Sequence, residues 1–94
     1  MKASPLISIL MPVRNDASVI ANCLDDIAKQ SFENYELLIV DDGSTDETPH
    51  ILEKTKGRDA RVRIIRTSAN GIVSALNTGL AECKGDYIAR MDAD

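Results

Sequence analysis

Short apolar runs recur along the chain, and each is bounded by proline, glycine or charged residues. Such runs are typical of strands that are buried on both faces of a parallel sheet. Pro12 ends the first run, and the carboxylates of Asp41 and Asp42 end the second. Arginines flank and interrupt the third, as suits a strand at a sheet edge. The pattern predicts four strands, over residues 6–11, 37–40, 62–66 and 87–91.

Between these runs, apolar residues return at the three- and four-residue spacing of a helix. Asp16 is a candidate N-cap for the first helix, which should end near residues 29–30. The apolar stripe of that helix is formed by Ile20, Cys23, Leu24, Ile27 and Ala28. The apolar positions of the third helix are Ile72, Val73, Leu76 and Leu80. Gly79 weakens this third helix, and Lys84 and Gly85 end it.

Two starting points are open for the second helix. Ser44 and Glu47 have the spacing of a capping box, which would start the helix there. Pro49 is favoured in the first helical turn, which would make Thr48 the cap and leave the preceding residues in a turn. In both cases Gly57 should end the helix.

The element order βαβαβαβ, with short connections, predicts an α/β fold: a parallel sheet with helices on its faces. Right-handed crossovers and a reversal after the third strand give the Rossmann-like strand order 3-2-1-4. The first two helices would then cover one face, and the third helix the other. Three stretches, residues 12–15, 41–42 and 92–94, would meet in one crevice at the carboxyl edge of the sheet.

The composition is that of one small globular domain over residues 1–94, with 44% hydrophobic and 28% charged residues. The net charge of −4 argues against general nucleic-acid binding. The basic residues between positions 54 and 66 interleave with acidic ones and include no aromatic, so a solvated sheet edge explains them better than an RNA patch. No apolar run is long enough to be a membrane segment.

The two cysteines are predicted to remain free thiols. Cys23 and Cys83 fall on helices at opposite faces of the sheet, farther apart than the roughly 7 Å between Cα atoms that a disulfide allows. No C-x-x-C motif indicates a zinc site, and the polar N-terminus does not have the form of a signal peptide. These features favour a reduced, cytoplasmic protein, with membrane association left open for a longer form of the chain.

Five short motifs occur in one order along the chain. They are SILMPVRN at 8–15, QSF at 30–32, VDDGSTD at 40–46, NG at 70–71 with ALN at 75–77, and GDYI at 85–88 with DAD at 92–94. Together they resemble the nucleotide-sugar-binding half of an inverting glycosyltransferase of family 2, which has the GT-A fold. The resemblance covers nearly the whole chain and ends at the D-x-D motif.

The resemblance implies the roles of particular residues. Asp42, supported by Asp41, would contact the nucleobase of a nucleoside diphosphate sugar. Asp92 and Asp94 would contact the ribose and hold a divalent metal, Mn²⁺ or Mg²⁺, on the diphosphate. The full set of substrate-binding candidates is Pro12, Val13, Arg14, Asp41, Asp42, Asn70, Gly71 and Asp92, and the metal-binding candidates are Asp92 and Asp94.

These residue types suit that chemistry. The carboxylate of Asp42 can accept the imide N–H of uracil, and it would repel the bare ring nitrogen of cytosine. Guanine also presents a ring N–H, so uridine diphosphate is the expected nucleotide and guanosine diphosphate stays open. A metal held by few carboxylates and by phosphate oxygens would neutralise charge on the departing nucleoside diphosphate as a Lewis acid.

Two features depart from the family pattern. Leu76 stands where many relatives carry an arginine, so a phosphate-binding role is in doubt there. The acceptor-binding strands and the catalytic base that relatives carry after the D-x-D motif are not in this sequence, and no residue is nominated as the base. The chain is therefore expected to bind donor without turnover on its own.

Two other functions compete with a transferase. The first is a non-catalytic nucleotide-binding module, which binding without turnover would reveal. The second is a phospho-receiver signalling domain, which also places an acidic pair at a strand end. That fold has its acidic pair after the first strand, whereas the first strand here ends in Met-Pro-Val-Arg.

The predicted topology leaves apolar surface uncovered. One helix alone would cover the second face of the sheet, and the fourth strand would be an unpaired edge. Both faces of the first two strands are largely apolar, and large exposed apolar patches usually find a partner. We therefore expect the chain to self-associate through that face or edge.

Overall fold

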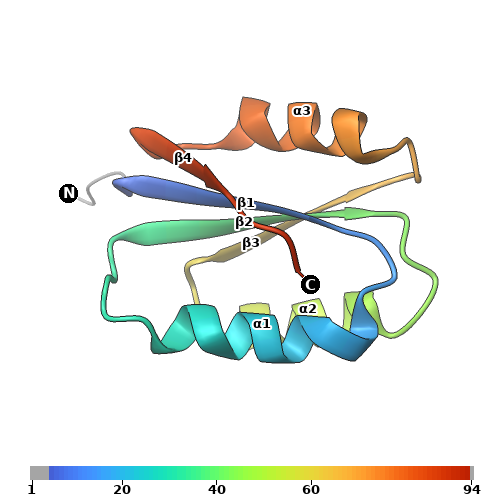
Figure 1. The fold of residues 1–94 in the computed structure, drawn as a ribbon, viewed down its shortest axis with the longest axis horizontal. Helices are drawn as coiled ribbons and strands as arrows, with labels where there is room; N and C mark the ends of the chain where they lie inside the picture. The colour runs from blue at the N-terminus through green and yellow to red at the C-terminus, as the bar shows by residue number, and fades with distance from the viewer. Residues whose placement is uncertain (1–4, 94) are drawn as a thin grey trace.

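The computed structural model describes residues 5–93 as a parallel sheet between two helical layers (Figure 1). The strands are β1 (Ile7–Val13), β2 (Tyr35–Asp42), β3 (Val62–Thr67) and β4 (Tyr87–Arg90). The helices are α1 (Ala17–Lys29), α2 (Thr48–Arg58) and α3 (Ile72–Glu82). The sheet has the order β3-β2-β1-β4 with every pair parallel, so the predicted order 3-2-1-4 is confirmed.

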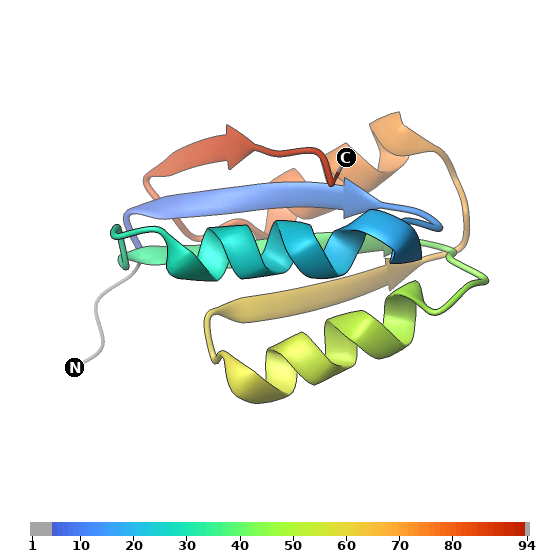
Figure 2. The same cartoon turned by 60° about the horizontal axis from the view of Figure 1, so that its bottom comes forward.

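The helices divide between the faces as predicted. Figure 1 shows α3 alone on one side of the sheet and the other two helices on the opposite side, and in Figure 2 α1 and α2 lie side by side. Cys23 packs against the core under α1 and α2, and Cys83 against the core under α3. Both cysteines are free, as predicted.

Strand β1 runs through Pro12 to Val13, so the prediction that proline ends it is wrong. The carbonyl oxygens of Leu6 and Leu10 accept hydrogen bonds from the N–H groups of Tyr87 and Met91, on the β4 side. Because backbone direction alternates along a strand, the N–H that Pro12 lacks would also point to that side. Strand β4 has already ended there, since its last residue, Arg90, is opposite Leu10. No ladder bond is lost, and the proline is tolerated.

The starts of the first two helices follow the predictions only in part. Asp16 occupies the N-cap position of α1, as predicted, but its side chain makes no capping hydrogen bond; the N–H of Ala17 instead donates to Asp46 Oδ2 at 3.2 Å. Helix α2 begins at Thr48 with Pro49 in its first turn, so the start at the Ser44 capping box is wrong, and the start at Pro49 is correct to within one residue, with Glu47 in place of Thr48 at the N-cap position. Gly57 lies inside α2, one residue before its end at Arg58.

The core has two unequal parts. The larger part, between the sheet and the α1–α2 layer, includes Met11, Ile20, Leu37, Ile39 and Leu52. The smaller part, under α3, consists of Leu10, Leu38, Val40 and Ala75. Gly79 brings α3 close to the sheet, since a Cβ there would overlap Leu10 and lie 3.0 Å from Val40 Cγ2.

Candidate functional site

A cavity of about 380 Å³ opens at the carboxyl edge of the sheet. The ends of β1 and β2, the segment after β4 and the first turn of α3 all contribute to its wall, so the predicted convergence of strand ends holds in the structure. Its lining residues are Pro12, Val13, Arg14, Asp16, Asp42, Gly71, Ile72, Ala75, Arg90, Asp92 and Ala93.

Asp42 is the most extensively hydrogen-bonded carboxylate of this cavity. Its Oδ1 accepts hydrogen bonds from the Thr67 hydroxyl at 2.7 Å and from the Asn70 N–H at 2.9 Å, and its Oδ2 accepts one from the Gly71 N–H at 2.8 Å. The Thr67 hydroxyl and the two N–H groups, together with the charge of Arg14, hold the pKa of Asp42 below its usual value. Asp42 is therefore an ionised acceptor that also anchors the start of α3.

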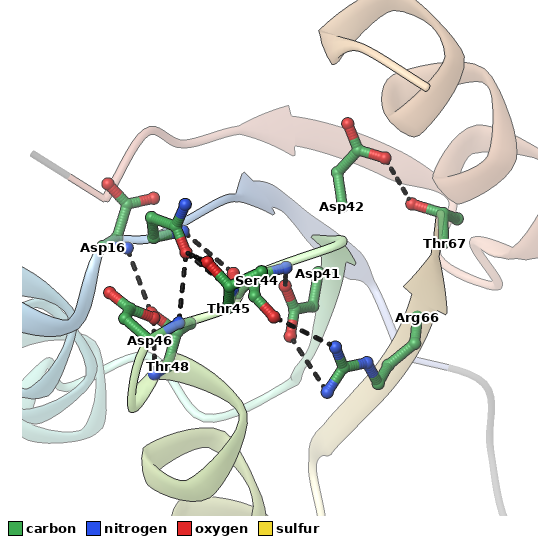
Figure 3. A network of polar contacts seen from close by, with 10 residues as sticks. Asp16, Asp41, Asp42, Ser44, Thr45, Asp46, Thr48, Arg66 and Thr67 are labelled. Atoms are coloured by element: carbon green, nitrogen blue, oxygen red, sulfur yellow. Dashed lines mark hydrogen bonds and ion pairs between the residues drawn. The ribbon is translucent and has the colours of Figure 1, made fainter. Parts of the chain in front are cut away.

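Asp41 does not reach this cavity. Successive residues of a strand point to opposite faces, and Figure 3 shows Asp42 turned toward Thr67 while Asp41 faces Arg66. Asp41 is fully buried; its Oδ1 accepts the Ser44 N–H at 3.1 Å, and its Oδ2 is 3.8 Å from the Arg66 guanidinium. These contacts stabilise the turn after β2, and Asp41 does not form part of the cavity wall.

The turn after β2 requires glycine at position 43. Gly43 has a φ of +77°, and a Cβ there would lie 2.8 Å from the backbone nitrogen of Ala69. The glycine thus lets this turn contact the loop between β3 and α3. Asp41 and Asp42, which precede this turn, point to opposite faces of the sheet.

A network of hydrogen bonds joins the β1–α1 turn to the β2–α2 turn (Figure 3). The Asn15 N–H donates to Ser44 Oγ at 2.9 Å, and Asn15 Oδ1 accepts the Thr45 N–H at 2.8 Å. Asn15 has a φ of +53°, in the left-handed region that asparagine tolerates better than most residues. The Asp16 N–H donates to Thr48 Oγ1 at 3.0 Å. These bonds fix the turn that carries Arg14 into the cavity wall.

Two charged residues from the end of β4 and the segment after it, Arg90 and Asp92, also line the cavity. The Arg90 guanidinium donates to Asp92 Oδ1 at 3.3 Å, and both side chains are more than half exposed. Asp94, the second predicted metal ligand, lies outside the described residues. Among residues 5–93, no group of three or more His, Cys, Asp or Glu side chains is arranged to hold a metal ion.

The structure brings together most of the predicted substrate-binding residues. Pro12, Val13, Arg14, Asp42, Gly71 and Asp92 line the cavity. Asn70 contributes its N–H to Asp42 instead of lining the wall. Leu76 packs against the core under α3.

Five lining residues were not predicted: Asp16, Ile72, Ala75, Arg90 and Ala93. Asp16 was interpreted as a helix cap, and Ile72 as one position of an apolar helix stripe. Arg90 had a sequence signal, since it lies two residues before the D-x-D motif. Its place in the cavity wall depends on the register of β4 against β1, which periodicity does not indicate.

Similarity to known proteins agrees with this geometry. The profile of glycosyl transferase family 2 matches residues 8–94. The chain belongs to this family, and its sheet is that of the GT-A fold. The uncharacterized glycosyltransferase EpsJ of Bacillus subtilis is 38% identical over 90 residues, which is 96% of this chain and 26% of that protein.

Two solved structures share the fold. The mannosyltransferase PcManGT from Pyrobaculum calidifontis, in complex with GDP-Man and Mn²⁺, has a TM-score of 0.88 and 28% identity, covering 98% of this chain and 28% of that one. Residues 1–349 of TarS from S. aureus, in complex with UDP, have a TM-score of 0.85 and 29% identity, covering 94% of this chain and 27% of that one. The present chain thus spans less than a third of these three proteins.

None of the helices within residues 5–93 combines the length and apolar character that crossing a membrane requires.

Proposed function

We propose that this chain is the donor-binding portion of a glycosyltransferase that uses a nucleoside diphosphate sugar, with uridine diphosphate as the nucleotide. The observation that carries this proposal is that Asp42, Arg14 and Asp92 line the same cavity, at the carboxyl edge of the sheet. Ligands of open α/β sheets bind at this edge, where the strand order reverses. The acceptor would be bound by parts of the protein beyond this portion.

The polar groups of the cavity suit the parts of such a donor. Asp42 is a buried, ionised acceptor for the ring N–H of a base. Arg14 and Arg90 line the same cavity, and their guanidinium groups carry the charge that a diphosphate requires. The turn carrying Arg14 is held to the β2–α2 turn by hydrogen bonds, so this part of the site needs little reorganisation when the donor binds.

A divalent metal fits the exposed carboxylate of Asp92. Mn²⁺ and Mg²⁺ prefer oxygen ligands, and Mg²⁺ in particular is commonly held by one or two carboxylates plus substrate phosphates and water. Asp92, with Asp94 as the second candidate, would hold the ion against the diphosphate. When bound, the metal supplies a Lewis acid for the departing nucleoside diphosphate. PcManGT was solved with Mn²⁺, which supports the use of such an ion here.

Calorimetric titration with UDP and Mn²⁺ tests the proposal. Asp42→Asn keeps the size of the side chain but replaces one acceptor oxygen with a donor, and we expect UDP to bind roughly ten-fold more weakly or worse. Asp86→Asn is the matched control, because it removes the same charge from an exposed residue at the other edge of the sheet. Equal UDP affinity for the wild type and Asp42→Asn would contradict the assignment of the cavity.

The metal is tested separately. Omission of Mn²⁺ should weaken UDP binding by the wild type, and Asp92→Asn should reduce this dependence on Mn²⁺. If UDP bound the wild type equally well with and without Mn²⁺, the metal part of the proposal would be wrong while the nucleotide part could stand. No release of UDP from a UDP-sugar is expected from this portion alone.

A further inference from the structure

The hydrogen bonds of Asp42 leave few of its acceptor positions for a ligand. A carboxylate offers about four lone-pair positions, two on each oxygen. The Thr67 hydroxyl and the Asn70 N–H occupy both positions on Oδ1, and the Gly71 N–H occupies one on Oδ2. One acceptor position, on Oδ2, is therefore left for a base.

The two oxygens also differ in the direction they face. Thr67 and Asn70, the partners of Oδ1, are not among the residues that line the cavity, whereas Gly71, the partner of Oδ2, is. Oδ1 is thus directed toward the β3–α3 loop, and Oδ2 is the oxygen on the cavity side. Figure 3 shows Asp42 reaching toward Thr67 in this way.

Thr67 is held where it can control this orientation. It is the last residue of β3 and lies directly opposite Asp42 in the parallel register of β2 and β3. Its hydroxyl must be the donor in this bond, because an ionised carboxylate can only accept. The Asn70 and Gly71 N–H groups hold one oxygen each, and the 2.7 Å bond from Thr67, the one side-chain donor to this carboxylate within residues 5–93, adds to them in fixing its rotation.

We propose that Thr67 is a positioning residue that sets nucleobase specificity: it holds Asp42 so that a single acceptor faces the cavity, which selects a base edge with one donor, as in uracil, over the two-donor edge of guanine. The inference rests on the proposed function, because it concerns the nucleotide of the same cavity. Similarity leaves this choice open, since PcManGT was solved with GDP-Man and TarS with UDP.

The chemistry of the two bases explains the selection. Uracil presents one imide N–H, which would use the remaining position on Oδ2. Guanine presents a ring N–H and an adjacent amino group, a pair that matches a carboxylate only when both of its oxygens face the base. Against the held Asp42 the amino group would lose its hydration without gaining an acceptor, and this is the usual basis of polar discrimination.

Inosine diphosphate separates this effect from the size of the ring. It is a purine like guanosine diphosphate, but its edge carries the ring N–H without the amino group. Titrations of the wild type with UDP, IDP and GDP, each with Mn²⁺, should give the tightest binding for UDP and no advantage of GDP over IDP. Tighter binding of GDP than of UDP, or an advantage of GDP over IDP of roughly ten-fold, would overturn the inference.

Thr67→Val removes the hydroxyl while keeping the branched shape, and Thr67→Ser keeps the hydroxyl. In Thr67→Val the carboxylate loses its side-chain donor and is held by the Asn70 and Gly71 N–H groups alone, so its rotation is less restricted. The affinity for GDP relative to that for IDP should then rise, by up to roughly ten-fold, while Thr67→Ser should retain the wild-type ratio. If Thr67 had a purely structural role, Thr67→Val would weaken the binding of all three nucleotides together and leave the ratio of the GDP and IDP affinities unchanged. That result would contradict the proposal.

The outcomes separate the inference from the proposed function. Suppose that UDP binds and that Asp42→Asn weakens UDP binding, but that GDP binds as tightly as UDP. The donor site is then supported, and the proposed role of Thr67 is rejected. If none of the three nucleotides binds the wild type, both the donor site and the specificity proposal are rejected.

Discussion

The two faces of the sheet differ in how completely they are covered. Helices α1 and α2 together bury one face, whose core includes fully buried side chains such as Ile20 and Leu52. Helix α3 alone covers the other, where its residues Val73 and Leu80 are 70% and 47% exposed. Strand β4 is exposed along its length, and within residues 5–93 it pairs with β1 alone.

On the less covered face, buried carboxylates at both edges of the sheet join distant parts of the chain. At its amino edge Glu36 accepts hydrogen bonds from Ser8, from Arg63 and from the N–H of Lys84, and at its carboxyl edge Asp42 accepts those of the β3–α3 loop. A buried polar group is tolerated only with a partner, so this face depends on hydrogen-bonding geometry as much as on apolar contact. Apolar burial stabilises the first face, and the second face provides the site.

The largest difference between the faces is expected from matched leucine truncations. Leu24 of α1 is 4% exposed and Leu80 of α3 is 47% exposed. Leu24→Ala should lower the free energy of unfolding by about 2–5 kcal/mol, because it leaves a cavity in the larger core. Leu80→Ala should cost less than about 1.5 kcal/mol, since less apolar area leaves the interior. Urea denaturation of both variants measures this, and equal losses would show that the faces are equally packed.

The free energy of unfolding at acidic pH should depend on Glu36. Burial alone would raise the pKa of Glu36, but the hydrogen bonds from Ser8, the Lys84 N–H and Arg63, with the charge of Arg63, outweigh it and hold the pKa below the ordinary 4.5. A group whose pKa is lowered by folding stabilises the protein above its unfolded-state value, and that stabilisation is lost as pH falls through the folded-state value.

Glu36→Gln should therefore cost about 1–3 kcal/mol at pH 7, and the difference from the wild type should shrink as pH falls below 4.5. Glu53→Gln, on the exposed side of α2, is the control and should leave the curve unchanged. Urea denaturation at several pH values measures both. A constant difference between wild type and Glu36→Gln at all pH values would mean that the charge of Glu36 contributes nothing.

Two helix glycines should respond oppositely to alanine. At Gly79 of α3 an added Cβ would overlap Leu10, so Gly79→Ala should destabilise by about 1–3 kcal/mol despite its better helix propensity. At Gly57 of α2 no atom lies within 4 Å of an added Cβ, so Gly57→Ala should stabilise by up to about 1 kcal/mol. Thermal unfolding of both variants decides this. A stabilising Gly79→Ala would show that α3 can move away from the sheet.

The smallest expected effect is weak self-association through the α3–β4 surface, which we define by Ile72, Val73, Leu80, Tyr87 and Ile88. Light scattering across a concentration series should show an increase in mass at high micromolar concentration. When the concentration equals the dissociation constant, the added stability is only about 0.4 kcal/mol.

Val73→Lys should abolish this association, because it places a charge on the α3–β4 surface at a side chain that is 70% exposed. His50→Lys adds a lysine to the exposed side of α2 and should leave the association unchanged. A clean monomer of the wild type at high micromolar concentration would contradict the prediction.

Much of the architecture followed from local patterns. Apolar runs and helical spacing located all seven elements, and the handedness of crossovers gave the strand order. The boundaries were less accurate where a distant partner decides them. Strand β1 continues through Pro12 because β4 has ended beside it. The first N–H of α1 is bound by Asp46, from a distant turn, and not by the side chain of the predicted cap Asp16.

The sequence by itself determined which segments meet at the carboxyl edge, because strand ends are marked by hydrophobic periodicity and parallel strands align their ends. Only the tertiary structure decided what each residue does there. Asp41 and Asp42 are adjacent, yet the alternation of the strand directs Asp41 to Ser44 and Arg66 and Asp42 to the cavity. The bond from Thr67 to Asp42 joins residues 25 positions apart and depends on the register of β2 against β3. Strand register and side-chain rotation arise from the packing of the whole sheet, so local sequence patterns do not specify them.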